Sequence, residues 1–278
     1  MGNTGQSRNT LSMHNPADWF TSYTLKLVAI LTMAVDHTGV VFEDMFSFPQ
    51  YWALRCIGRA AFPLFCFLLA EGFRYTRNRL AYLRNMAIFA VFSEIPFDLA
   101  LMGWDSRSRN CNVFCTLTIG LLAIFITDTL TQKLKQKLNR QIYVKLLAVP
   151  VNVAIIVMAC ELAEFLRTDY GFAGVLLIVM IYYAEKLETV LAFLTRNAQL
   201  RRNICAGLAA VAWMALYDYS NGWVIECYGA WAAVLMVLYN GKRGSYHLSK
   251  WFFYVFYPVH LFILWLIRYA FFAFYGFF

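Results

Sequence analysis

The chain has 278 residues, of which 61% are apolar and only 14% are charged. Soluble domains usually carry about 25% charged and 45–50% apolar residues, so this composition excludes an ordinary soluble domain and indicates an integral membrane protein. The net charge of +8 would suggest a nucleic-acid partner for a soluble protein. In a membrane protein, the distribution of Lys and Arg among the loops indicates instead which loops face the cytoplasm. No nucleic-acid partner is therefore expected.

The apolar segments predict an all-α, polytopic integral membrane protein. A helix needs roughly 20 mostly apolar residues to cross a bilayer. By that standard about nine transmembrane helices are expected, and those between 170 and 239 are short. Residues 1–24 are expected to form a cytoplasmic tail, and residues 25–278 a single transmembrane domain. The predicted spans lie near 25–46, 52–73, 83–102, 113–130, 142–162, 170–187, 204–219, 223–239 and 251–275.

Basic residues concentrate in alternate loops. With nine spans, 18 of the 24 Lys and Arg residues fall on one side of the membrane, including the groups at 74–84, 133–145, 186–202 and 242–250. Cytoplasmic loops are enriched in Lys and Arg. We therefore expect the N-terminus in the cytoplasm and the C-terminus outside.

Ionisable residues lie inside several predicted spans, where they are costly and usually pair with each other or face a cavity. Asp36 and His37 are adjacent in the first span, and Glu94 and His260 lie in the third and last. A rise of about 1.5 Å per residue places His37 about 18 Å and His260 about 14 Å from the inner edge. Arg59 lies about 20 Å from the same edge, so these groups are expected at one level.

Asp36 is expected to pair with Arg55 or Arg59. Neighbouring residues on a helix point about 100° apart, so Asp36 does not orient His37. Arg55 and Arg59 are four residues apart and share one helix face. The carboxylate would hold the helices together while the imidazole carries out chemistry. For His37 and for His260, a purely structural hydrogen bond to a backbone carbonyl is an equally good explanation.

The chain contains seven cysteines, none with the paired spacing of a zinc site, and no metal is expected. Cys115 could in principle be a nucleophile. Buried free thiols are the simpler interpretation.

A series of motifs between Leu25 and Ile267 resembles the TraX family, which is named for a conjugative pilin acetylase. In order they are LKLVAILTMAVDHTGVVF, LRCIGRAAFPLFCFLLAEGFRYTRNRLAYL, FSEIPFDLAL, NVFCTLTIGLLAI, DYGFAGVLLI, LYNGKRG and FFYVFYPVHLFILWLI. The resemblance implies a multi-pass protein of the bacterial inner membrane. It also implies acetyl transfer from acetyl-CoA to an amine on a membrane or exported acceptor, such as the N-terminus of a pilin subunit.

The resemblance extends to larger membrane acyltransferases, the acyltransferase-3 and lysosomal heparan N-acetyltransferase groups, in which an intramembrane histidine is regarded as essential. It implies catalytic roles for His37, Arg59 and His260. Asp36 is added to this candidate catalytic set as their neighbour, although pairing with an arginine is its simpler role. A histidine can accept the amine proton near neutral pH, and a cation or other donor can stabilise the oxyanion. The sequence leaves open which histidine is the base.

CoA phosphates favour arginine forks and other basic groups at the cytoplasmic mouth. Residues 239–244, YNGKRG, offer glycines and two cations there. The expected cofactor-binding residues are Arg55, Glu71, Arg74, Arg77, Asn240, Lys242 and Arg243. The positive-inside rule explains the basic loops without any ligand. A proton-coupled transporter and a non-catalytic conjugation assembly protein, both in contact with membrane lipid, remain alternatives that CoA binding would separate from an acetyltransferase.

Overall fold

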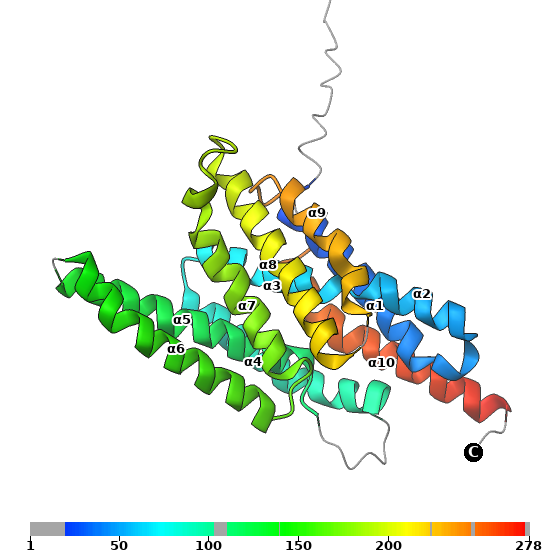
Figure 1. Cartoon of the computed structure of the whole chain (residues 1–278). Coiled ribbons are helices and arrows are strands. Elements are labelled where there is room, and N and C mark those ends of the chain that lie inside the picture. Colours follow the sequence, from blue (N-terminus) through cyan, green and yellow to red (C-terminus); the bar gives the residue numbers. More distant parts are fainter. Residues whose placement is uncertain (1–19, 103–109, 139, 223, 246–247, 276–278) are drawn as a thin grey trace, which may run out of the picture.

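The predicted spans coincide with helical structure in the computed structural model (Figure 1), which describes residues 20–102, 110–138, 140–222, 224–245 and 248–275. Residues 1–19 of the predicted tail and the last three residues of the predicted domain lie outside the described part. Within that part there is no β-strand, and one isolated bridge joins Cys111 to Thr168. The all-α fold class is confirmed.

In the described part of the chain, ten α-helices and several short helical turns follow one another. In order they are α1 (Ser22–Val41), η2 (Glu43–Met45), α2 (Phe48–Gly58), α3 (Ala61–Tyr75), α4 (Arg79–Phe97), η3 (Asp98–Met102), α5 (Val113–Lys137), α6 (Gln141–Phe165), α7 (Gly171–Lys186), η4 (Glu188–Leu191), α8 (Ala198–Asn221), η5 (Glu226–Ala230), α9 (Trp231–Leu238) and α10 (Lys250–Tyr275).

Among the residues that the structure describes, six helical segments are long and apolar enough to cross a membrane: Ser22–Val41, Phe48–Tyr75, Arg79–Met102, Val113–Lys137, Gln141–Phe165 and Lys250–Phe274. The other predicted spans correspond to α7, α8 and η5–α9, which are shorter or less apolar. The chain is therefore a multi-pass membrane protein. A count of nine crossings and their orientation stay predictions.

The loops gather at two opposite ends of the bundle. At the first, which we call the amino end, the Phe20 carbonyl accepts a hydrogen bond from Asn240 N at 2.9 Å. At the second, the carboxyl end, Arg268 pairs with Asp44 at 2.7 Å. The amino end lies toward the top of Figure 1 and the carboxyl end toward the bottom.

The predicted span 52–73 is one crossing made of two helices, because α2 stops at Gly58 and α3 starts at Ala61. Pro63 explains the break. It has no N–H to donate to the carbonyl four residues earlier, that of Arg59, and its ring crowds that carbonyl. The apolar pattern predicted a span over 52–73 without indicating a break. The break places Arg59 at the end of α2, in the middle of the crossing.

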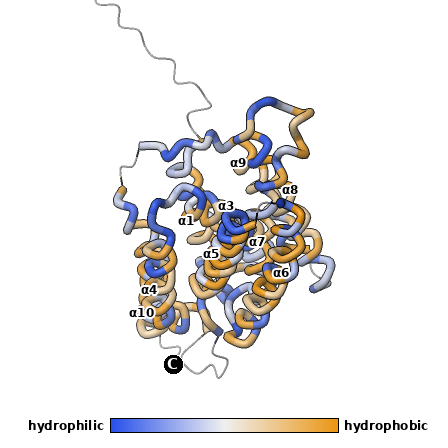
Figure 2. The backbone as a smooth tube through the Cα atoms, turned by 90° about the vertical axis from the view of Figure 1, so that its left-hand side faces the viewer, coloured by the Kyte–Doolittle hydropathy of each residue, from blue (hydrophilic) through white to orange (hydrophobic). Residues whose placement is uncertain are grey.

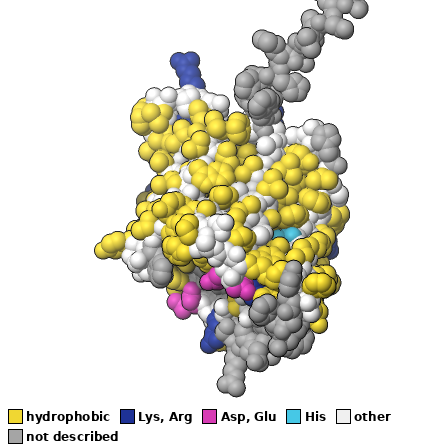
Figure 3. All heavy atoms as spheres, turned by 90° about the vertical axis from the view of Figure 1, so that its right-hand side faces the viewer, with side chains coloured by type: hydrophobic (Ala, Val, Ile, Leu, Met, Phe, Trp, Pro, Cys, Tyr) yellow, Lys and Arg dark blue, Asp and Glu magenta, His cyan; other side chains and the backbone are white. Residues whose placement is uncertain are grey.

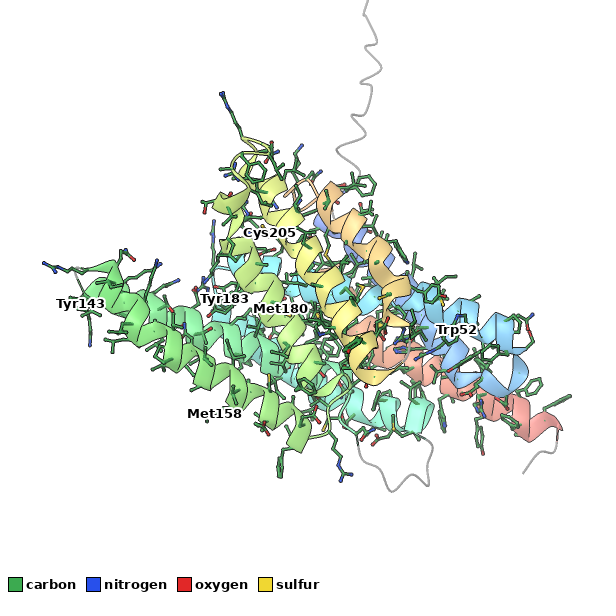
Figure 4. The ribbon with its side chains drawn as sticks, viewed as in Figure 1. Trp52, Tyr143, Met158, Met180, Tyr183 and Cys205 are labelled. Carbon is green, nitrogen blue, oxygen red and sulfur yellow. The ribbon has the colours of Figure 1, made fainter. Side chains whose placement is uncertain are left out.

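The hydrophobic core is centred on α3. The helices α6 and α10 lie at the periphery of the bundle. Phe67 and Leu64 of α3 are fully buried, as are Leu177 and Ile178 of α7. Figure 2 shows hydrophobic residues along most of α6 and α10, and these helices bury few of them inside the bundle. In Figure 4 the labelled Met158 projects from α6 away from the bundle, and it is 70% exposed. Such apolar outer surfaces suit contact with lipid.

Candidate functional site

A buried ionic cluster joins α1 to α2. Asp36 Oδ1 accepts a hydrogen bond from Arg59 Nη2 at 2.6 Å, and its Oδ2 accepts one from Arg55 Nη1 at 2.7 Å. The predicted pairing of Asp36 is confirmed, and it involves both arginines rather than one. Asp36 and Arg59 are each only 7% exposed. Burial makes the pairing obligatory, because an unpaired charge would be strongly destabilising at this depth.

Gly58 gives Asp36 the room to reach both arginines. A Cβ atom at position 58 would lie 2.2 Å from Asp36 Cβ and 2.3 Å from its Oδ1. The absence of a side chain therefore lets α1 approach α2 closely at this point.

A second carboxylate, which the sequence analysis missed, completes the cluster. Glu226 Oε1 accepts a hydrogen bond from Arg59 Nη1 at 2.8 Å, and Glu226 is only 2% exposed. Asp218, near the end of α8, holds the preceding loop by accepting hydrogen bonds from the backbone N–H groups of Glu226 and Cys227 at 2.9 and 2.8 Å. Arg59 thus links α1, α2 and η5.

Gly229 brings η5 against the break between α2 and α3. A Cβ atom at position 229 would lie 2.6 Å from the Arg59 carbonyl oxygen. Only glycine permits this approach, which puts the Glu226 carboxylate within reach of the Arg59 guanidinium.

His37 and His260 are hydrogen-bonded to each other, with His37 Nδ1 2.7 Å from His260 Nε2. His260 Nδ1 lies 2.8 Å from the Phe256 carbonyl oxygen, which can only accept. In a neutral pair, His260 therefore carries its proton on Nδ1, and its Nε2 accepts from His37 Nδ1–H. It follows that His37 Nε2 carries the free lone pair. In this arrangement His37 Nε2 is the ring nitrogen of the pair that can accept a further proton, and His260 holds the His37 ring through its Nδ1 atom.

An inner cavity of about 300 Å³ adjoins this cluster. Its polar lining combines both arginines with three carboxylates, two tyrosines and one histidine: Asp36, His37, Arg55, Arg59, Asp169, Tyr170, Tyr217 and Glu226. His260 is not in the lining, which fits a supporting position behind His37. Figure 3 shows a small area of histidine surface between hydrophobic side chains.

A larger cavity of about 780 Å³, the mouth cavity, is lined by residues of the amino-end loops. Four cations line it: Lys26, Arg77, Arg243 and Lys250. Aromatic side chains such as Tyr239, Phe253 and Tyr254 line it as well. Met33, Phe65 and Val113 border both cavities, so the two meet at these three side chains.

The structure places some of the residues expected at the cytoplasmic mouth in the lining of the mouth cavity and others outside it. Glu71, Arg77 and Arg243 line the mouth cavity. Asn240 and Lys242 shape the loop beside it, since Asn240 Oδ1 accepts a hydrogen bond from Lys242 N at 2.8 Å.

Three residues lie elsewhere than the sequence suggested. Arg55 belongs to the ionic cluster at the inner cavity and does not line the mouth cavity. Arg74 is held in an ion pair with Glu185, a carboxylate that spacing alone could not reveal. Glu94 does not line the inner cavity, and its carboxylate accepts a hydrogen bond from the side chain of Asn112. The physical reason is that a buried charge is destabilising unless it is paired, and the packing of the helices decides which partner lies near enough.

Among the described residues no cluster of His, Cys, Asp or Glu side chains could hold a metal ion. The residues that the sequence analysis missed are Glu226, Asp169 and Tyr170 at the inner cavity and Lys26 and Lys250 at the mouth. Glu226 carried a usable signal, an acid near the start of a predicted span. The two lysines had been counted only as topology signals.

Comparison with known proteins gives a consistent result. The family model described as TraX protein matches residues 21–268. The probable fimbrial assembly protein FimC, serogroup H1, of Dichelobacter nodosus is 29% identical over 258 residues, which cover 88% of this chain and 94% of that protein. The uncharacterized protein RP591 of Rickettsia prowazekii is 30% identical over 73 residues, which cover 26% and 27% of the two chains. No solved structure matches this chain.

Proposed function

The chain belongs to the TraX family, and on this premise we propose that it is a membrane-embedded acetyltransferase, which transfers an acetyl group from acetyl-CoA to an amine. The observation that carries the proposal is the junction of the two cavities. A basic, aromatic cavity opens at one end of the bundle and meets, at Met33, Phe65 and Val113, a cavity that contains a histidine with a defined lone pair.

The mouth cavity suits the nucleotide part of acetyl-CoA. Arg77, Arg243, Lys26 and Lys250 supply positive charge for its phosphates. Tyr239, Phe253 and Tyr254 offer ring faces for its adenine. Lys26 and His37 lie on the same helix, about 16 Å apart along its axis at 1.5 Å per residue. A slender thioester arm would cover that distance and deliver the acetyl group between Met33 and Phe65.

His37 acts as general base in this proposal. The Nε2 atom of His37 accepts a proton from the amine as the new C–N bond forms. His260 holds the His37 ring in place by accepting a hydrogen bond from His37 Nδ1–H. The C–S bond then breaks, and His37 returns the proton to the departing thiolate. The Arg55 Nε–H is buried without a hydrogen-bond partner among the described residues, so it is available to stabilise the oxyanion.

The amine would belong to an exported or membrane protein. The name of the Dichelobacter relative refers to fimbrial assembly. That name, together with the TraX family, supports a pilus subunit as the acceptor and the bacterial inner membrane as the location.

CoA binding tests the proposal. Isothermal titration of CoA into the purified full chain in nanodiscs should give saturable binding. The double variant Arg77→Ala/Arg243→Ala should weaken it by at least about tenfold, because each charge-assisted hydrogen bond contributes roughly 1.5–3 kcal/mol. Added salt should weaken it further. The control Lys133→Ala/Lys135→Ala removes the same charge from exposed positions on α5, outside the cavity, and should leave binding unchanged. A wild-type chain that does not bind CoA would instead support a transporter or a non-catalytic assembly protein.

A further inference from the structure

The loop between α6 and α7 adopts an unusual backbone at the carboxyl end of the bundle. Arg167 and Tyr170 have positive φ values of 50° and 64°, a conformation that residues other than glycine rarely adopt. The loop is held by a hydrogen bond from Asp169 N to the Cys111 carbonyl at 2.8 Å, and the Asp169 carbonyl accepts a further one from Thr116 Oγ1. Strained backbone of this kind persists where the surroundings enforce it, often at functional sites.

This backbone aims two side chains at the inner cavity. The Tyr170 ring stacks on Phe62 with ring centroids 3.8 Å apart, and its hydroxyl accepts a hydrogen bond from Arg59 at 3.3 Å. Asp169 also lines the cavity. Its carboxylate forms no hydrogen bond or ion pair with another described residue, unlike those of Asp36 and Glu226.

The charges around the cavity do not balance. Its lining holds two guanidinium groups and three carboxylates, which leaves one negative charge in excess when His37 is neutral. Glu226, which is 2% exposed, also has one carboxylate oxygen, Oε2, that is buried without a hydrogen-bond partner among the described residues. Two tyrosine rings, Tyr170 and Tyr217, complete the lining on this side. One additional positive charge, placed against carboxylates and aromatic faces, would satisfy this site.

We propose that Asp169, supported by Glu226 and the two tyrosines, is the subsite that binds the acceptor amine as an ammonium ion and removes the first of its protons. The inference rests on the proposed acetyl transfer. An ammonium group must lose two protons to become an amide. The first passes to the Asp169 carboxylate and leaves a neutral amine. The second passes to His37 as the C–N bond forms and then to the CoA thiolate, while Asp169 releases its proton at the carboxyl end.

Burial raises the pKa of Asp169 from its ordinary value of 3.8 to about 6, which suits a carboxylate that takes up and releases a proton near neutral pH. The charged and titratable groups that face it come from several neighbouring elements: Asp36 and His37 of α1, Arg55 and Arg59 of α2, Tyr170 before α7, Tyr217 of α8, Glu226 of η5 and Tyr257 of α10.

The test uses n-hexylamine as the probe, with 1-hexanol as its uncharged counterpart, and measures binding to the full chain in nanodiscs by calorimetry. We expect hexylamine, and not hexanol, to bind the wild type. Asp169→Asn should weaken binding about 10- to 100-fold, because it removes a charge-assisted hydrogen bond, and Asp169→Glu should restore part of it. Asp44→Asn makes the same chemical change at the same end of the bundle but outside the cavity, and should have no effect. Wild-type affinity should fall as the pH drops through 6, and this fall should be absent in Asp169→Asn.

The outcomes separate this inference from the proposed function. Equal hexylamine binding by the wild type and Asp169→Asn would overturn the inference, even if the chain transfers acetyl groups. Failure of the wild type to bind hexylamine at all would overturn it too. Selective loss of amine binding in Asp169→Asn, in a chain that transfers no acetyl group, would uphold the ammonium subsite and refute the acetyltransferase.

Discussion

At the scale of the residue, the neighbours Asp36 and His37 have different partners. Asp36 reaches Arg55 and Arg59 on α2, whereas His37 reaches His260 on α10. The 100° between successive residues on a helix makes this division unavoidable. The pairing of Asp36 could be predicted from charge and spacing alone. The meeting of Glu226 and Asp169 at one cavity could not, because their positions depend on hydrogen bonds of the backbone N–H groups of these residues to Asp218 and Cys111, respectively, which no local pattern encodes.

Asp36→Asn should destabilise the protein. It would leave Arg55 without a carboxylate and Arg59 with Glu226 alone. Breaking a buried pair by removing one partner typically costs about 3–5 kcal/mol. Thermal unfolding in detergent would measure the loss. Asp44→Asn, at a largely exposed pair, should cost at most about 1 kcal/mol. Unchanged stability of Asp36→Asn together with lost activity would give Asp36 a direct chemical role instead.

Asp169→Asn should have the opposite effect on stability at neutral pH. Because the folded pKa of about 6 lies above the ordinary 3.8, the folded state holds a proton that the unfolded state has lost between these values. Wild-type stability therefore falls as pH rises from about 4 to 6 and stays reduced above that. Asparagine removes this penalty, so the variant should be more stable at pH 7.5 by up to about 3 kcal/mol and no more stable at pH 3.5. A less stable variant at pH 7.5 would show that the ionised carboxylate is structurally required.

At the scale of the element, the interruption between α2 and α3 and the short η5 determine the site. The sequence predicted the crossing but not its break, although Pro63 and Gly58 were visible in the motif GRAAFP. A proline near a predicted helix centre is often tolerated with only a kink. Here the end of η5 packs against the break between α2 and α3. This contact brings together Arg59 and Gly229, which lie 170 positions apart, and no local sequence pattern encodes it.

Gly229→Ala should therefore be more damaging than an ordinary glycine-to-alanine change. The added methyl would lie 2.6 Å from the Arg59 carbonyl oxygen and must push η5 away. Overpacking of this kind typically costs about 1–3 kcal/mol, and it should separate Glu226 from Arg59. Gly207→Ala is the control, because there the nearest atom to a Cβ lies 3.3 Å away. Equal unfolding temperatures of the two variants would contradict the close contact.

At the scale of the whole molecule, the positions of the crossings could largely be predicted from apolar segments and alternating charge. Of the described helical segments, six have the length and apolarity of a span, and those at the other three predicted spans are too short or too polar. There is a physical reason why these three segments do not resemble ordinary membrane spans. Much of α7 is buried against other helices, and polar residues of α8 such as Asn203 and Asp218 have partners inside the bundle. Hydropathy alone therefore underestimates them.

Topology can be tested by cysteine labelling in a background without the native cysteines. Gln136→Cys, at the exposed end of α5, lies at the amino end, and Glu43→Cys lies at the carboxyl end. In intact cells a membrane-impermeant maleimide should label Glu43→Cys but not Gln136→Cys. Permeabilisation should make both react. Labelling of Gln136→Cys in intact cells would reverse the orientation or change the number of crossings.

The most direct test of the whole account is the single-turnover rate of acetyl transfer from acetyl-CoA to a primary amine, measured for the wild type and His37→Gln together with CoA affinity. A general base contributes about 10²–10⁴-fold to such a rate. His37→Gln should therefore bind CoA as tightly as the wild type and transfer acetyl groups at least about a hundredfold more slowly. His260→Gln should show a smaller loss, because it orients the base without replacing it. Near-wild-type transfer by a folded His37→Gln protein would contradict His37 as the base.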